Sequence, residues 1–283
     1  VYKRQMYADG GAGPGGTGHH LHDPKTTAAR VARMVDTLEH YPMANGVVMD
    51  GPEWGYEMAP HHMNHRSYFF NDLPEAVEPM AKDLGYDYAA MVAAKDRLLD
   101  RFHNLDPKRI RSNARGGIVG AYRMLGADAD LMAWLSFRCE TLTRNFRHMR
   151  EGVAAHLDRP VRMGCGPRSA AFAPLCGYDF VDLAEFMDFL LPKHYFFHRG
   201  FDGFIGTVYR YAQTLMEWNP GLRVSDTLEV VQALFGIILP GVDDDMLDFE
   251  SALSPEFFEQ VVTQETKRAI AAVDAPERIV PWL

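Results

Sequence analysis

Short apolar segments that stop abruptly at prolines limit the folds open to this chain. The segments span residues 46–50, 161–165 and 187–191, and the first stops at Gly51-Pro52, the second at Gly166-Pro167 and the third at Pro192. Proline cannot donate to the hydrogen-bond ladder of a sheet, so each segment must end there. Short runs rich in β-branched and other apolar residues are typical of strands that are covered on both faces, as in a parallel sheet. Together with residues 278–282, they predict four adjacent parallel strands in chain order, with helices outside.

Helical periodicity fills the stretches between these strands. Asp23 is a plausible N-cap that is followed by Pro24 in the first turn, and the apolar spacing after it predicts a helix that ends near Tyr41. The other predicted helices cover residues 87–104, 128–157, 181–185, 207–218, 225–235 and 255–273, whereas 115–125 is ambiguous. This alternation predicts an α/β fold, a (β/α)₈ TIM barrel in one domain over 1–283. We expect the barrel to be incomplete, without its first strands and its last βα unit, and residues 52–85 to be a long loop insertion over the active site.

Composition excludes several classes of function. The chain is 47% hydrophobic, which is enough for a substantial core, and its net charge of −9 argues against binding to the phosphate backbone of nucleic acids. No apolar run reaches the roughly 20 residues of a membrane span, and no signal peptide is recognisable. Three cysteines, Cys139, Cys165 and Cys176, indicate neither a disulfide framework nor a zinc ribbon. We expect a cytoplasmic protein without cofactor or metal, and without nucleic-acid or membrane partners; its oligomeric state stays open.

Charged and aromatic residues follow each predicted strand. Asp50, Glu53 and Glu57 come after the first strand, interleaved with Trp54 and Tyr56. Because parallel strands place their carboxyl ends at one edge of a sheet, the residues after the other strands should meet this cluster. Those residues are Arg168, Lys193, His194, Tyr195 and Trp282. The alternative is structural: the rings plug the mouth of the fold, and the cations pair with Asp50 or Glu57.

In its architecture and in the motif Gly-Pro-Glu-Trp at residues 51–54, the chain resembles the barrel glycoside hydrolases. In the clan of cellulases and β-galactosidases, an acid/base glutamate stands at the end of the fourth strand within an Asn-Glu-Pro type motif, which Glu53 matches loosely, with Pro52 in place of the Asn. In clans resembling α-amylases and α-galactosidases, an aspartate at that strand end is the nucleophile, and this points to Asp50. The resemblance implies a carbohydrate substrate.

Glycoside hydrolysis also fits the residue types themselves. The reaction needs two carboxyl groups in different environments, and their separation decides between retention and inversion. Contact with Trp54 could keep Glu53 protonated by desolvation. Exposed rings such as Trp54, Tyr56, Tyr195 and Trp282 would offer flat apolar surfaces to a sugar, while Arg168, Lys193 and His194 could grip hydroxyls or a carboxylate.

Two alternatives stay open. The His20-Leu21-His22 pattern, with His194 after another strand, is also found in metal-dependent hydrolases of the amidohydrolase type. However, this pattern lies in a glycine-rich loop and not at a strand exit. A carbohydrate-binding barrel that has lost catalysis would present the same acids and rings. Bound metal would favour the first alternative, and sugar binding without turnover would favour the second.

Overall fold

A three-stranded parallel sheet, β1-β2-β3, forms the centre of the computed structural model, which describes residues 21, 23–63, 68–71, 73–199 and 203–282. β1 (Gly46–Met49) pairs in parallel with β2 (Arg162–Cys165), and β2 pairs in parallel with β3 (Phe189–Leu190). Isolated parallel bridges join Leu190 to Ile279 and Lys193 to Trp282, so a fourth segment follows β3. The predicted order and direction of the four segments are therefore confirmed.

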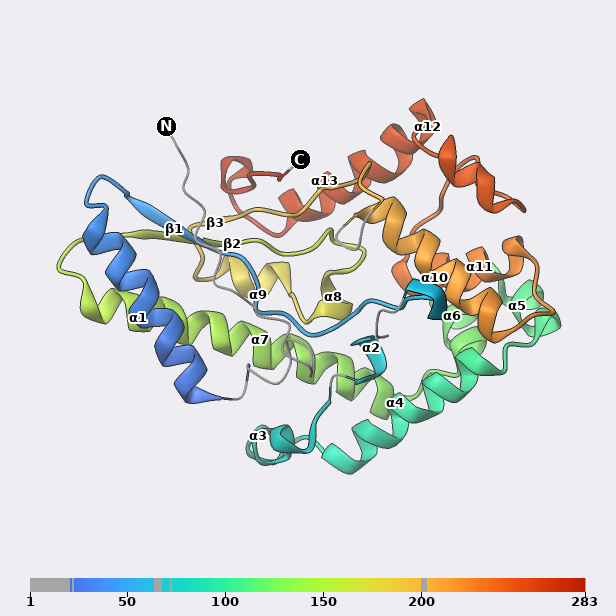
Figure 1. Ribbon diagram of the computed structural model, residues 1–283, viewed down its shortest axis with the longest axis horizontal. Helices are drawn as coiled ribbons and strands as arrows, with labels where there is room; N and C mark the ends of the chain where they lie inside the picture. The colour runs from blue at the N-terminus through green and yellow to red at the C-terminus, as the bar shows by residue number, and fades with distance from the viewer. Residues whose placement is uncertain (1–20, 22, 64–67, 72, 200–202, 283) are drawn as a thin grey trace.

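The predicted (β/α)₈ barrel is wrong. The described chain is mostly helical and has one small sheet, and the described residues between β1 and β2 form helices but no strand (Figure 1). The inference failed because a proline stop after an apolar run defines where one strand ends and says nothing about how many strands close a sheet. The protein is a predominantly helical α/β fold.

Most predicted helices are present at the expected places. Asp23 caps α1 by accepting hydrogen bonds from the backbone of Lys25 and Thr26, and Asp87 and Asp128 cap α4 and α7 in the same way. The ambiguous stretch after residue 115 forms α6. The α-helices are α1 (Pro24–His40), α2 (Tyr68–Asn71), α3 (Glu78–Asp83), α4 (Tyr88–His103), α5 (Pro107–Asn113), α6 (Gly117–Leu125), α7 (Ala129–His156), α8 (Ala173–Cys176), α9 (Phe180–Ala184), α10 (Phe204–Trp218), α11 (Val224–Phe235), α12 (Pro255–Phe257) and α13 (Thr263–Ala271). A π-helical turn, Phe258–Val262, joins the last two, and none of the described helices is long and apolar enough to cross a bilayer.

The long helix α7 organises the packing around the sheet. It contacts α1 and α4, and in Figure 1 it runs beneath the strands from the left side of the molecule to α4. Its buried face carries large side chains, among them Trp134, Phe137 and Phe146. Helices α10 and α11 pack together on the other side of the segment that follows β1.

The first part of the 52–85 stretch passes through the interior instead of over the surface. All residues from 52 to 60 are buried except the half-buried Gly55, and their peptide groups bond to several distant elements. The Trp54 amide donates to the Cys176 carbonyl, and the Glu57 carbonyl accepts from the amide of Phe69. The remainder of the stretch folds into short helices, among them α2 and α3. The three acids expected at the exit of the first strand, Asp50, Glu53 and Glu57, thus lie at the edge of the core or inside it.

Candidate functional site

An ion pair connects the exits of β1 and β3. The Lys193 ammonium lies 2.5 Å from a carboxylate oxygen of Asp50, and the two side chains are only 7% and 14% exposed. The Ser169 hydroxyl donates to the Lys193 carbonyl at 2.9 Å, which fixes the backbone that carries the lysine. Gly166 lies directly beside the pair, since a Cβ there would be in ordinary van der Waals contact, 3.5 Å from both the Asp50 carboxylate and the Lys193 chain. Asp50 is the most accessible of the three acids after β1.

A second ion pair connects the exits of β1 and β2. The Arg168 Nε donates to both oxygens of Glu53, at 3.1 and 3.0 Å, and its Nη2 also donates to the same carboxylate. The guanidinium lies 5.2 Å from the centre of the Tyr56 ring. A carboxylate that accepts several hydrogen bonds from one guanidinium is stabilised in its ionised form. This geometry counts against the predicted role of Glu53 as the general acid, because protonation would remove the charge that pairs with Arg168.

The third acid, Glu57, pairs with a residue that the sequence analysis missed. Arg210 of α10 donates from Nη2 to Glu57 at 2.8 Å, and the Thr207 hydroxyl donates to the same oxygen at 3.1 Å. Burial raises the pKa of Glu57 to about 7, although the charge and hydrogen bonds of Arg210 oppose the rise. The sequence signal that could have identified Arg210 is its place on the apolar face of a helix, because a buried charge there requires a partner of opposite charge.

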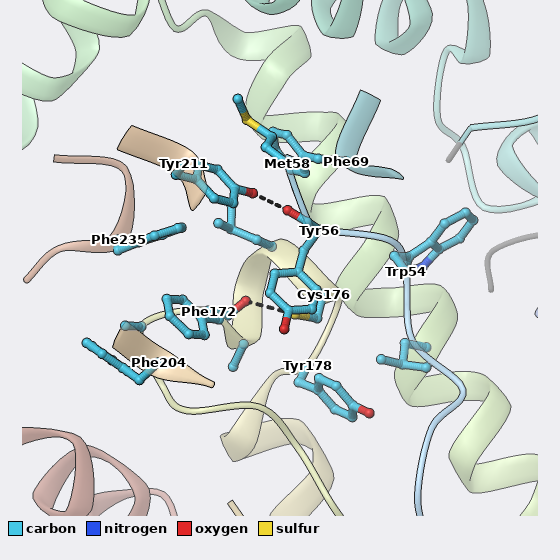
Figure 2. Close-up of a cluster of buried hydrophobic side chains, with 14 of the residues drawn as sticks. Trp54, Tyr56, Met58, Phe69, Phe172, Cys176, Tyr178, Phe204, Tyr211 and Phe235 are labelled. Carbon is cyan, nitrogen blue, oxygen red and sulfur yellow. Dashed lines mark hydrogen bonds between the residues drawn. The ribbon is translucent and has the colours of Figure 1, made fainter. Parts of the chain in front are cut away.

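Two of the four predicted sugar-binding rings are core residues. Trp54 is fully buried, and its indole N–H donates to the Arg138 carbonyl at 3.0 Å and to the Thr141 hydroxyl at 3.1 Å, so α7 holds it. Tyr56 is also buried and stacks on Phe172 at 6.0 Å. In Figure 2 the two rings point to different sides of the segment, Tyr56 toward Cys176 and Phe172 and Trp54 away from them. Trp54 therefore lies against α7 and not over the Glu53 carboxylate, and it cannot desolvate that acid as predicted.

The other two rings form a half-buried pair at the strand exits. Tyr195 and Trp282 meet edge to face, with their centres 5.9 Å apart and their planes at 66°. The Trp282 carbonyl accepts a hydrogen bond from the His194 amide at 2.9 Å, which ties the pair to the end of β3. Both rings therefore retain some accessible apolar surface, as predicted for rings that pack against a sugar.

His194 precedes Tyr195 in the chain and is 2% exposed. Its ring stacks on Phe196 at 4.9 Å, and neither ring nitrogen has a hydrogen-bond partner in the part of the chain that the structure describes. Burial lowers the pKa of His194 to about 4, so the imidazole is neutral at pH 7. It therefore does not serve as the cationic partner of Asp50, a role that Lys193 takes.

The metal-dependent alternative gains no support from the described residues, in which no three His, Cys, Asp or Glu side chains come together in a metal-binding cluster. His20 and His22, on which that alternative depends, lie outside the described residues.

The structure thus brings together Asp50, Glu53, Arg168 and Lys193, places Tyr195 and Trp282 at the same strand exits, and sends Trp54 into the core. In comparisons with known proteins, no family model, no curated protein and no solved structure matches this chain.

Proposed function

We propose that the protein hydrolyses glycosidic bonds, with Asp50 as the carboxylate that faces the sugar. The observation that carries the proposal is the convergence at one sheet edge of the Asp50–Lys193 and Glu53–Arg168 pairs, whose members are far apart in the chain. Carboxyl ends of parallel strands are the usual place for ligands in α/β folds, because the loops there meet.

Asp50 fits the role of an ionised carboxylate beside the anomeric carbon. Its neighbour Lys193 stabilises the negative charge, and this charge would in turn stabilise the positive charge that develops on the sugar ring. Arg168 holds the neighbouring acid, Glu53, in a fixed orientation and acts as a positioning residue. The half-buried Tyr195–Trp282 pair would pack against the C–H face of the sugar.

A carbohydrate-binding protein without catalysis is the second candidate. It is favoured by one observation: Asp50 and Glu53 are each held in an ion pair, and paired carboxylates are poor proton donors. This candidate shares the sugar platform and differs from the first only in turnover.

A panel of 4-nitrophenyl glycosides separates the two candidates. Because 4-nitrophenolate is a good leaving group, its departure needs little acid assistance, and the panel reports on Asp50 independently of a proton donor. We expect release of 4-nitrophenolate from at least one glycoside and saturable binding of the corresponding free sugar in calorimetry. Binding without release would favour the carbohydrate-binding protein, and absence of both would contradict both candidates.

A further inference from the structure

A pocket that shares no residue with the strand exits lies between α6, α11 and the π-helical turn before α13. Its volume is about 650 Å³, which is within the range of small-molecule sites. Helices α6 and α11 pack side by side, at the right of Figure 1. Three segments line the pocket, within residues 113–121, 229–238 and 260–268.

The pocket presents apolar surface that the described chain leaves open to solvent. Ile118 of α6 lines it and is 86% exposed, and Ile238, after α11, lines it and is half-exposed. Ile237 and Val261 extend the same apolar lining. Covering aliphatic side chains is favourable in proportion to the apolar area removed from water, so the pocket suits a ligand with an apolar body.

The accessible charge in the lining is positive. The pocket contains two ion pairs, Arg115–Glu229 and Arg268–Glu265. The two arginine side chains are 65% and 47% exposed, whereas their carboxylate partners are 20% and 1% exposed. The solvent-facing groups of both pairs are therefore the guanidinium groups, and they are complementary to an anionic group on the ligand.

Of the two cations, Arg115 has donors to spare. Arg268 donates from Nη1 to Glu265 and from Nη2 to the Gly236 carbonyl, so the protein itself occupies its fork. Arg115 donates to Glu229 through Nε, at 3.2 Å, and its two terminal nitrogens form no hydrogen bond with any residue that the structure describes. Two parallel N–H groups of this kind match the two oxygens of a carboxylate.

Backbone irregularities occur in two of the three lining segments. Arg115 has a φ of 55°, in the left-handed region, and among the described residues it is the one residue other than glycine with a positive φ. Strained residues of this kind cluster at functional sites and ligand clamps. The π-helical turn Phe258–Val262 supplies Gln260 and Val261 to the lining, and such turns are frequent at functional sites.

We propose that this pocket binds a small amphiphilic carboxylate. Its apolar body lies against Ile118, Ile238 and Val261, and its carboxylate accepts hydrogen bonds from the terminal nitrogens of Arg115. Glu229 does not prevent this binding, because its charge is already compensated through the Nε of Arg115. The site is separate from the strand exits, so the inference does not depend on the proposed glycosidase activity.

Three compounds with one alkyl chain and different head groups test the proposal: octanoate, octanol and octyltrimethylammonium. Binding is measured on the whole chain by calorimetry and thermal unfolding at constant ionic strength. We expect saturable binding of octanoate with a rise in Tm, at least about tenfold tighter than binding of octanol, and weaker binding still of the cation. Equal affinity for octanoate and octanol, or no binding of octanoate, would overturn the proposal.

Arg115→Asn should reduce the affinity for octanoate to that for octanol and leave the affinity for octanol unchanged. Asparagine tolerates the left-handed conformation and the lost ion pair is exposed, so this variant should melt close to the wild type without ligand. Arg123→Gln is the control, because Arg123 is an exposed cation of α6 that does not line the pocket. Unchanged binding of octanoate by Arg115→Asn would overturn the role of Arg115.

Ile118→Ser should weaken octanoate and octanol alike, because both use the apolar lining. This variant and the head-group preference of the wild type decide the question even if Arg115→Asn does not fold. Sedimentation of the wild type and Ile118→Ser covers another occupant, a second copy of the chain. A dimer that Ile118→Ser dissociates, without binding of octanoate to the wild type, would contradict the proposal and assign the pocket to self-association.

Discussion

At the scale of single residues, His194 gives the fold a pH dependence with a known sign. Its pKa is lowered to about 4 by burial, whereas the unfolded chain has the usual value near 6.5. Below pH 6.5 the unfolded state takes up a proton that the folded state refuses, so stability is lost as the pH falls toward 4. The loss approaches about 3 kcal/mol, at 1.36 kcal/mol per pKa unit.

His194→Phe should remove this loss, because phenylalanine keeps the stack on Phe196 and does not titrate. Urea unfolding of both proteins between pH 7 and pH 4 measures the difference, in which the opposite contribution of Glu57 cancels. The expected result is a variant that gains stability relative to the wild type as the pH falls. The exposed His156, changed to Gln, is the control; a constant difference between His194→Phe and wild type would contradict the assignment.

The Glu53–Arg168 pair is the second test at this scale. Arg168→Met leaves the Glu53 carboxylate buried without its partner, which is expected to reduce the free energy of unfolding by about 3–5 kcal/mol. Arg144→Met breaks the exposed Arg144–Glu140 pair on α7 and should change it by less than about 1 kcal/mol. Denaturant unfolding of both variants gives the comparison, and similar losses would mean that Glu53 is solvated.

At the scale of elements, the sequence predicted where strands and helices begin or end better than it predicted the course of the segments between them. Strand ends followed from Gly51-Pro52 and Gly166-Pro167, and helix starts from capping aspartates, because both are local chemistry. The course of residues 52–60 could not be predicted, since acids and glycines there indicate a solvated loop, whereas tertiary partners such as Arg210 satisfy them in the interior. Of the candidate site, the strand-exit residues were found and the helix-borne Arg210 was missed, because a helical arginine is usually exposed.

The buried course of this segment predicts that Trp54 and Trp282, the tryptophan beside the end of β3, have different roles. Trp54→Phe deletes the indole N–H that bonds α7, so it should reduce the free energy of unfolding by about 1–3 kcal/mol and leave sugar affinity unchanged. Trp282→Ala should weaken sugar binding and have a smaller effect on stability, because that ring is half-buried at the strand exit. Calorimetry and thermal unfolding of both variants separate the roles; weaker sugar binding by Trp54→Phe would return Trp54 to the site.

At the scale of the whole molecule, the predicted order of the parallel segments was right and the barrel was wrong. Consecutive strands that are joined by helices tend to lie side by side and parallel, so the order and direction of the segments could be predicted. The number of strands could not, because it depends on segments such as the one between β1 and β2, whose described elements are all helical. The small sheet is nevertheless sufficient to bring Asp50 and Lys193 to one edge.

The turnover of Asp50→Asn tests this convergence as a catalytic site most directly. On the best 4-nitrophenyl glycoside of the panel, we expect kcat to fall by at least about 10²-fold, the lower range for a lost catalytic acid or base, with unchanged affinity for the free sugar. Asp130→Asn, at an exposed position of α7, should match the wild type. A kcat of the Asp50→Asn variant within a few-fold of the wild-type value would contradict a catalytic role of Asp50.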